Sequence, residues 1–278
     1  MKIILGIPVV GQEELTQRCV ESVETTVYDR TQFQLVLIDN GSQPPFGTSN
    51  YAGDIFPLTG YRNETNLGFY YPLQQLSERH PDAELIGLCH NDVLFYENGW
   101  DQRLRLAFQS DPKLGLVGLG GSNQADLAGG RGGGTMMRFR GEKGQRQVGE
   151  RIDDLRPAVL LDSLFLLFRR DVIPHLKIDG DISLCHFYDK IWSLRTIEAG
   201  YHVAVLGSEI DHLGGQTSTS QAYDDAARAW CEQRGIPVPE SGDKAMYREA
   251  ERRFLSEYRD QKKMLPCAVR PDYSLWRP

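Results

Sequence analysis

The stretch VLIDNGS at residues 36–42 decides how this chain folds. Its apolar half is typical of a buried strand, and its Asp-Asn-Gly-Ser half is typical of a tight turn. Working outward, residues 2–9 form an earlier apolar run, and residues 13–27 carry apolar or small side chains at helical spacing. A strand, a helix and a second strand in succession predict a right-handed βαβ unit, and therefore a parallel sheet.

The rest of the chain continues the alternation of strands and helices. We expect strands near 54–58, 84–90, 114–119, 159–168 and 201–206, and helices at 71–80, 100–109, 187–199, 222–234 and 244–263. The pattern predicts an α/β fold with a mostly parallel central sheet flanked by helices over residues 1–215. A C-terminal helical extension follows over 216–278. Residues 120–156 are rich in Gly and Arg, and we expect a flexible loop there.

Composition excludes several classes of protein. With 40% hydrophobic and 25% charged residues among 278, the chain is neither disordered nor fibrous. Five scattered cysteines without a CxxC pair argue against a disulfide framework or a zinc site and favour a reducing, cytoplasmic location. The sequence also predicts no signal peptide and no membrane-spanning segment. A net charge of −7 argues against a surface devoted wholly to nucleic acid.

Polar side chains follow three of the expected strands, at the point where each strand ends. They are Asp39-Asn40, His90-Asn91-Asp92 and Asp211-His212. In open α/β sheets, ligands bind beyond the carboxyl ends of the strands. We therefore expect these three groups to converge on one cleft.

Each candidate side chain has a functional and a structural interpretation. Asp92 can ligate a hard divalent cation or lie solvated in a turn, and His212 can ligate Mn²⁺ or be a structural residue. Asp39 can accept hydrogen bonds from a nucleotide or stabilise an Asx-turn. Asp189, in the first turn of a helix, is a candidate general base or a carboxylate that favours the helix dipole. For His90 we expect a structural role.

Taken in order, the motifs resemble the inverting glycosyltransferases of family 2, which have the GT-A nucleotide-diphospho-sugar transferase fold. The resemblance covers roughly residues 1–220. Its motifs are GIPV at 6–9, CVESV at 19–23, VLIDNGS at 36–42, NLGF at 66–69, NDV at 91–93 with GW at 99–100, LFLLFR at 164–169, DKIWSLR at 189–195, AGY at 199–201 and HLGG at 212–215. It implies a nucleotide-binding half at 1–110 and an acceptor half at 111–215.

The resemblance also implies a nucleotide-sugar donor, commonly a UDP-sugar, with Mn²⁺ or Mg²⁺. By position, Asp92 and His212 would bind the metal, and Asp189 would be the catalytic base. The residues that would hold the nucleotide are Pro8, Val9, Asp39, Asn40, Asn66, Gly68 and Asn91. The chain departs from the family where the usual DxD is His90-Asn91-Asp92, which retains only the last carboxylate. It departs again at Tyr188 and Ile191, where the family often has acids.

Two other functions remain open at this point. One is a nucleotidyltransferase, although the loop PVVGQE at 8–13 has no basic residue to grip a triphosphate. The other is a catalytically weakened sugar-nucleotide-binding protein. The acceptor can be a glycan, a lipid-linked glycan or a nucleic acid, the last through the basic stretch 131–156, which can equally be a solvated loop. The C-terminal helices can pack on the core or mediate a homodimer.

Overall fold

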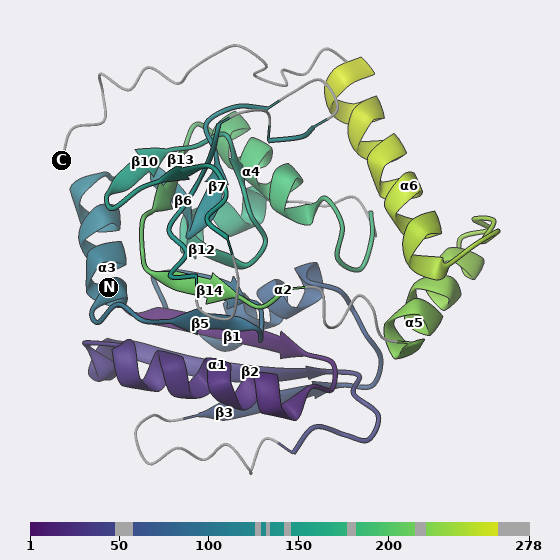
Figure 1. The fold of residues 1–278 in the computed structure, drawn as a ribbon, viewed down its shortest axis with the longest axis horizontal. Coiled ribbons are helices and arrows are strands. Elements are labelled where there is room, and N and C mark those ends of the chain that lie inside the picture. Colours follow the sequence, from purple (N-terminus) through teal and green to yellow (C-terminus); the bar gives the residue numbers. More distant parts are fainter. Residues whose placement is uncertain are drawn as a thin grey trace.

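The computed structural model describes residues 1–47, 58–125, 129–131, 134–141, 146–176, 182–214 and 221–260. An eight-stranded sheet forms the centre, in the order β10-β13-β6-β12-β4-β1-β2-β3 (Figure 1). Neighbours β4, β1, β2 and β3 run parallel, whereas β12 is antiparallel to both β4 and β6. The strands are β1 (Ile3–Val9), β2 (Phe33–Asn40), β3 (Thr59–Asn63), β4 (Leu85–Cys89), β6 (Leu114–Gly118), β10 (Leu155–Pro157), β12 (Phe165–Arg169) and β13 (His202–Leu206).

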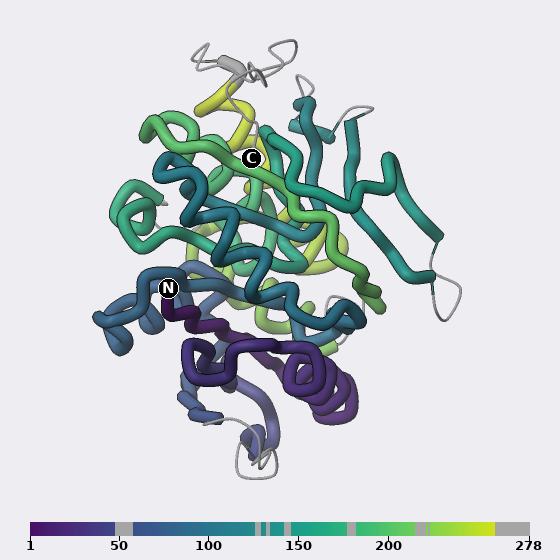
Figure 2. Tube along the Cα trace, turned by 90° about the vertical axis from the view of Figure 1, so that its left-hand side faces the viewer, coloured from purple at the N-terminus to yellow at the C-terminus, as the bar shows by residue number. Residues whose placement is uncertain are grey.

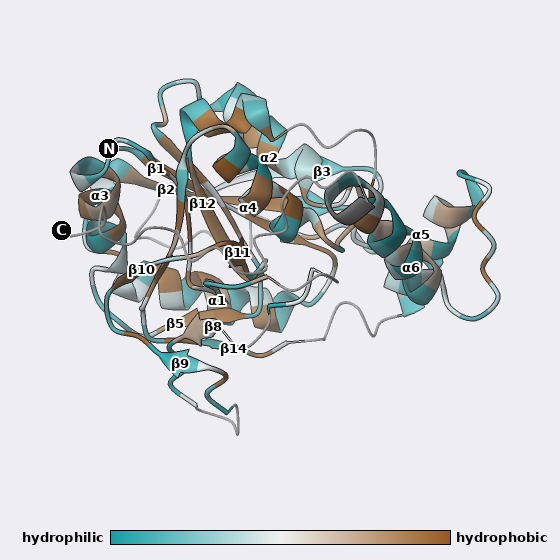
Figure 3. Ribbon diagram, turned by 90° about the horizontal axis from the view of Figure 1, so that it is seen from above, coloured by the Kyte–Doolittle hydropathy of each residue, from teal (hydrophilic) through white to brown (hydrophobic). Residues whose placement is uncertain are grey.

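Helices cover both faces of this sheet. Alternate residues of β1 face opposite sides, since Ile3 packs with α1 (Glu13–Thr26) and α3 (Trp100–Ser110), and Ile4 packs with α2 (Tyr70–Arg79) and α4 (Tyr188–Glu198). Burial on both faces explains why β1 is apolar throughout. In Figure 2 the purple N-terminal segments gather at one end of the molecule, and Figure 3 shows the hydrophobic strands between the helical layers.

A smaller four-stranded sheet occupies the segment where we expected a flexible loop. Its order is β11 (Leu160–Leu161), β7 (Gly120–Ser122), β8 (Thr135–Met137) and β9 (Glu150–Arg151). Gly121 makes the β7–β11 pairing possible, because a Cβ there would lie 2.5 Å from the Leu160 carbonyl oxygen. Such glycine-rich strands carry no alternation of apolar residues, so the sequence gives no strand signal. Residues 126–128, 132–133 and 142–145 of the expected loop lie outside the described residues.

Other element boundaries also differ from expectation. The strand expected near 54–58 falls mostly outside the described residues, and β3 lies just after it. The single strand expected at 159–168 is divided into β11 and β12, because the Asp162 carboxylate accepts a hydrogen bond from the Leu164 amide at 3.3 Å and closes a turn. A short 3-10 helix precedes β2 (Arg30–Gln32), and another follows β12 (Arg170–His175).

The C-terminal extension packs on the core through α5 (Gln221–Glu232) and α6 (Gly242–Leu255), which continues as a π turn over Ser256–Asp260. Phe254 of α6 joins Phe187 and Ile191 in one apolar cluster, and Trp230 of α5 joins Leu184 in another. Both helices lie along one side of the sheet domain (Figure 1). Across the described residues, every helix is too short or too polar to cross a bilayer.

Candidate functional site

The carboxyl ends of the parallel strands and the two-stranded sheet β5 (Val93–Phe95) and β14 (Ile210–His212) meet at a cavity of about 270 Å³. Its lining includes four of the seven expected nucleotide-binding residues and both expected metal ligands. The lining residues are Pro8, Val10, Asn40, Asn66, Phe69, His90, Asn91, Asp92, Leu184, Cys185, His186, His212 and Tyr223. The cavity therefore brings together Asn40, His90-Asn91-Asp92 and His212 from the three strand ends, whereas Asp39 and Asp211, which we expected at the same cleft, are not among its lining residues.

Asp92, His212 and His90 form a compact cluster on one wall of this cavity. In the β5–β14 pair, His212 lies opposite Val93, which places its Nε2 atom 3.2 Å from Asp92 Oδ1 and 3.4 Å from His90 Nδ1. Asp92 Oδ1 is buried, and its contact with His212 Nε2 is an ion pair that does not have hydrogen-bond geometry. One potential ligand atom from each of the three residues lies within 4.8 Å of the others, so the cluster can hold a metal ion.

Burial and mutual charge shift the pKa values of all three side chains in this cluster. Burial alone raises the pKa of Asp92, but the adjacent His212 outweighs it and holds that pKa below 3.8. Burial lowers the pKa of His212, and Asp92 reverses the effect, so that the His212 pKa lies above 6.5. Burial, and next the charge of His212, lowers the pKa of His90 to about 4. At neutral pH, Asp92 is therefore ionised and His90 is neutral, the forms in which carboxylates and imidazoles bind metals, whereas the raised pKa of His212 favours an imidazolium that would have to lose its proton to a bound cation.

His90 is the residue that sequence reasoning missed. We expected a structural role for it, because a lone histidine after a strand carries no functional signal of its own. Its position in the first place of the His90-Asn91-Asp92 triple, where the resembling family has a carboxylate, is the signal that could have identified it. A second hydrogen-bonding contact, from His90 Nε2 to Tyr188 Oη at 3.2 Å, connects the cluster to α4.

Asn40 fixes the turn at residues 66–68 that borders the cavity. Its buried amide nitrogen donates to Asn66 Oδ1 at 3.1 Å and to the Gly68 carbonyl at 3.0 Å, and its oxygen accepts from the Leu67 amide at 3.2 Å. Gly68 has φ +70°, and a Cβ there would lie 2.7 Å from the Leu184 carbonyl oxygen. Only glycine fits this position, so Gly68 shapes the turn without lining the cavity.

Asp39 faces away from the cavity, and the protein occupies both of its carboxylate oxygens. The side chain is 1% exposed, and it accepts hydrogen bonds from the amides of Ser42 at 2.8 Å and Phe46 at 3.0 Å. Arg62 forms an ion pair with it. This geometry supports the Asx-turn interpretation of Asp39. Val9 is likewise buried outside the cavity, whose lining includes its neighbour Val10.

Asp189 lies at the start of α4 and is 7% exposed. Its Oδ1 accepts the Lys190 amide at 2.9 Å, and its Oδ2 lies 4.0 Å from the guanidinium of Arg131, which also pairs with Asp162 at 2.8 Å. Burial raises the pKa of Asp189 above 3.8, Arg131 opposes that rise, and Asp162 adds to it. The charge of Asp162 also acts on His90, where it opposes the lowered pKa, and on His212, where it adds to the raised pKa, so it links Asp189 electrostatically to the cluster of His90, Asp92 and His212.

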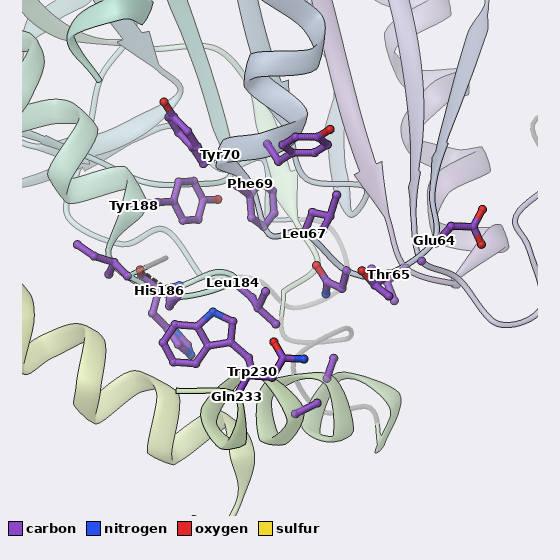
Figure 4. Close-up of a pocket in the computed structure, with 18 of the residues that line it drawn as sticks. Glu64, Thr65, Leu67, Phe69, Tyr70, Leu184, His186, Tyr188, Trp230 and Gln233 are labelled. Atoms are coloured by element: carbon purple, nitrogen blue, oxygen red, sulfur yellow. Dashed lines mark hydrogen bonds between the residues drawn. The ribbon is translucent and has the colours of Figure 1, made fainter. Parts of the chain in front are cut away.

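A larger cavity of about 810 Å³ adjoins the first and shares Asn66, Phe69, Leu184 and His186 with it. Phe69 stacks on Tyr188 with ring centroids 4.7 Å apart and planes 9° apart. Figure 4 shows these rings above Leu184, with Trp230 of α5 and Gln233, just after that helix, on the opposite side. The C-terminal extension therefore supplies one wall of the space next to the metal-binding cluster.

Several arginines in the described part of the basic stretch 131–156 form ion pairs within the molecule. Arg138 pairs with Glu97, Asp153 and Glu209, and Arg151 also pairs with Glu209. These pairs favour the interpretation of the stretch as a structural or solvated segment over that of a nucleic-acid-binding surface.

Comparison with known proteins identifies the fold. No protein-family model and no curated protein sequence matches the chain. Among solved structures it is similar to S. aureus TarS 1–349, with 14% identity over 97% of this chain and 76% of that one, and a TM-score of 0.50. It is also similar to the mannosyltransferase PcManGT from Pyrobaculum calidifontis, solved with GDP-Man and Mn²⁺. The identity is 13% over 96% of this chain and 72% of that one, and the TM-score is 0.50. It is similar as well to GalNAc-T7, solved with UDP, GalNAc and Mn²⁺, with 12% identity over 96% of this chain and 58% of that one, and a TM-score of 0.58.

These similarities confirm the predicted fold class. The chain has the GT-A glycosyltransferase fold, with a mixed central sheet between helices. Identities of 12–14% establish the fold alone, and assignment to family 2 stays a prediction. The chain spans a little over half of the GalNAc-T7 chain.

Proposed function

We propose that the protein transfers a sugar from a nucleoside-diphosphate sugar, specifically a UDP-sugar, to an acceptor hydroxyl with inversion at the anomeric carbon. The observation that carries this proposal is the convergence of Pro8, Asn40, Asn66, Asp92 and His212 on one cavity at the carboxyl edge of the sheet. Ligands of open α/β sheets bind at this edge. The solved structures of similar fold that contain UDP-GlcNAc or GDP-Man support a nucleotide-sugar donor.

The residues around the cavity fit a divalent cation, Mn²⁺ or Mg²⁺. His90, Asp92 and His212 would hold it, and the clearest sign of fit is that one potential ligand atom of each lies within 4.8 Å of the others. A bound cation would neutralise the negative charge that develops on the departing nucleoside diphosphate. Two imidazoles beside a single carboxylate favour Mn²⁺ over Mg²⁺, which prefers oxygen ligands.

Asp189 is the proposed general base. It would remove the proton of the acceptor hydroxyl as that oxygen attacks the sugar from the face opposite the diphosphate. The amide of Lys190 fixes one carboxylate oxygen and leaves the other directed toward Arg131. Burial raises the proton affinity of Asp189, and a base whose pKa is closer to the working pH transfers protons more efficiently.

A second candidate is a protein that binds a sugar nucleotide without transferring the sugar. One observation favours it: the Asp189 carboxylate lines neither of the two cavities described above and faces Arg131. Nucleotidyl transfer has less support, because residues 8–13 offer no basic side chain to a triphosphate.

Thermal unfolding with a panel of nucleotides and sugar nucleotides, with and without Mn²⁺, tests donor binding. A ligand at 100 times its Kd stabilises the folded state by about 2.7 kcal/mol. We expect UDP and one UDP-sugar to raise the Tm in the presence of Mn²⁺ and GDP to have little effect. If every nucleotide leaves the Tm unchanged, the donor proposal is wrong. Hydrolysis or transfer assays on the stabilising sugar nucleotide then separate transfer from binding alone.

A further inference from the structure

A second cluster of metal-ligating side chains lies at the same smaller cavity as the Asp92 cluster, with two of its three members in the lining. It consists of Cys185, His186 and Asp243, and one potential ligand atom from each lies within 4.8 Å of the others. We propose that these three residues form a zinc-type cation site that fastens the C-terminal helices to the wall of the donor cavity. This site is independent of the proposed sugar transfer.

The donor set selects the kind of cation. A thiolate, an imidazole and a carboxylate together are characteristic of Zn²⁺, whereas Mg²⁺ and Ca²⁺ take oxygen ligands. Tetrahedral bonds of about 2.0–2.3 Å place neighbouring ligand atoms about 3.3–3.8 Å apart. His186 Nε2 and Asp243 Oδ1, which are 2.7 Å apart, would therefore have to separate slightly to bind the same ion. Cys185 and His186 both line the cavity, so an ion bound to them would lie at its wall.

The backbone already holds two of the ligands in place. Cys185 and His186 precede α4 in a turn where Ser183 Oγ accepts the His186 amide at 2.6 Å and donates to the His186 carbonyl at 2.7 Å. Asp243 comes from the first turn of α6, where its own amide donates to Asp224 Oδ1 at 3.2 Å. His186 Nε2 and Asp243 Oδ1 are 2.7 Å apart, across 57 positions of sequence. The cluster therefore joins the C-terminal extension to the segment that leads into α4.

Tyr223 of α5 provides the outer support that metal sites typically have. Its hydroxyl contacts Cys185 Sγ, and with a thiolate there it can act only as the hydrogen-bond donor. Burial raises the pKa of the Cys185 thiol to about 12, which disfavours a thiolate without a cation beside it. Cation binding would therefore release the thiol proton to solvent and leave the sulfur charge balanced by the ion.

The test uses the full chain, stripped of metal and titrated with Co²⁺ and with Zn²⁺. We expect one equivalent of Co²⁺ to produce thiolate-to-cobalt charge-transfer absorption, and Zn²⁺ to displace it. Cys185→Ser should abolish this absorption and weaken Zn²⁺ binding at least about 100-fold. Loss of a residue that only supports a ligand typically weakens metal affinity by no more than about 100-fold. Cys231→Ser is the matched control, because Cys231 is buried in the same apolar cluster as Tyr223 but contacts only the Gly242 carbonyl through its sulfur among the hydrogen bonds described.

Further variants keep the outcome decisive. Asp243→Asn preserves the shape of the side chain and should weaken Zn²⁺ binding even if Cys185→Ser does not fold. Asp92→Asn should leave the charge-transfer absorption intact, which separates this site from the cluster proposed to bind the donor metal. Absence of thiolate absorption in the unmodified chain, or its persistence in Cys185→Ser, would overturn the proposal.

Discussion

Replacement of Asp189 by Asn tests the proposed catalytic base with little disturbance of the fold. The amide oxygen of Asn can still accept the Lys190 amide, which lies 2.9 Å away. Arg131 loses its contact at 4.0 Å but keeps its pair with Asp162 at 2.8 Å. Because burial already disfavours the charged carboxylate, a neutral amide adds no desolvation cost. We expect the free energy of unfolding to change by no more than about 1 kcal/mol.

The rate should respond much more strongly than the stability. Loss of a general base typically costs about 10²–10⁴-fold in rate, or about 2.7–5.5 kcal/mol of activation free energy. We expect kcat for sugar transfer to fall by this factor while the Kd for UDP, measured by calorimetry with Mn²⁺, stays within twofold. Asp162→Asn is the matched comparison, because it disturbs the same arginine and should cost less. A kcat within threefold of the unmodified enzyme, or a parallel loss of UDP affinity, would refute the role of Asp189.

Three further predictions follow from the same geometry. Arg131→Met removes the positive charge that opposes the raised pKa of Asp189, so that pKa should rise further. Because the base must be deprotonated, the acid limb of the pH profile of kcat/KM should move to higher pH. An acid limb that does not move would disprove the coupling between Arg131 and Asp189. Asp92→Asn should weaken UDP binding in Mn²⁺ but not in EDTA, as measured by calorimetry; equal weakening in both would exclude a metal-mediated effect. Asn40→Ala leaves the buried partners of its amide unsatisfied and should cost about 2–4 kcal/mol in urea unfolding, against a negligible change for the exposed Gln74→Ala; a cost below 1 kcal/mol would contradict the bracing role.

The parts of the fold that sequence predicts well are those governed by local patterning. Strands β1 and β2 are apolar along nearly their whole length because both faces are buried, and the polar residues that end them mark the binding edge. Strand β3 lies at the edge of the sheet, is half exposed and has the sequence TGYRN, which carries no such pattern. Its position could therefore not be predicted from the sequence.

The candidate site was predictable in position but not in every partner. Asp92 and His212 were paired by their places after strands, and the structure brings them into contact. The environment of Asp39 depends on Arg62, a contact that spans 23 positions and has no sequence signal. Likewise, the contact of His90 with His212, which lies 122 positions away, has no sequence signal.

The position of α5 and α6 has a consequence for how the binding site comes into being. The cavities are bounded by residues from Pro8 to Arg234, so their outer side is missing until the late helices dock. A ribosome makes the whole central sheet before it reaches α5, and the nascent sheet domain therefore exposes Leu184, Phe187 and Ile191 to water in the meantime. The protein should therefore bind a nucleotide only after α5 and α6 have been synthesised. Deletion of both helices should give an aggregation-prone domain that binds no nucleotide.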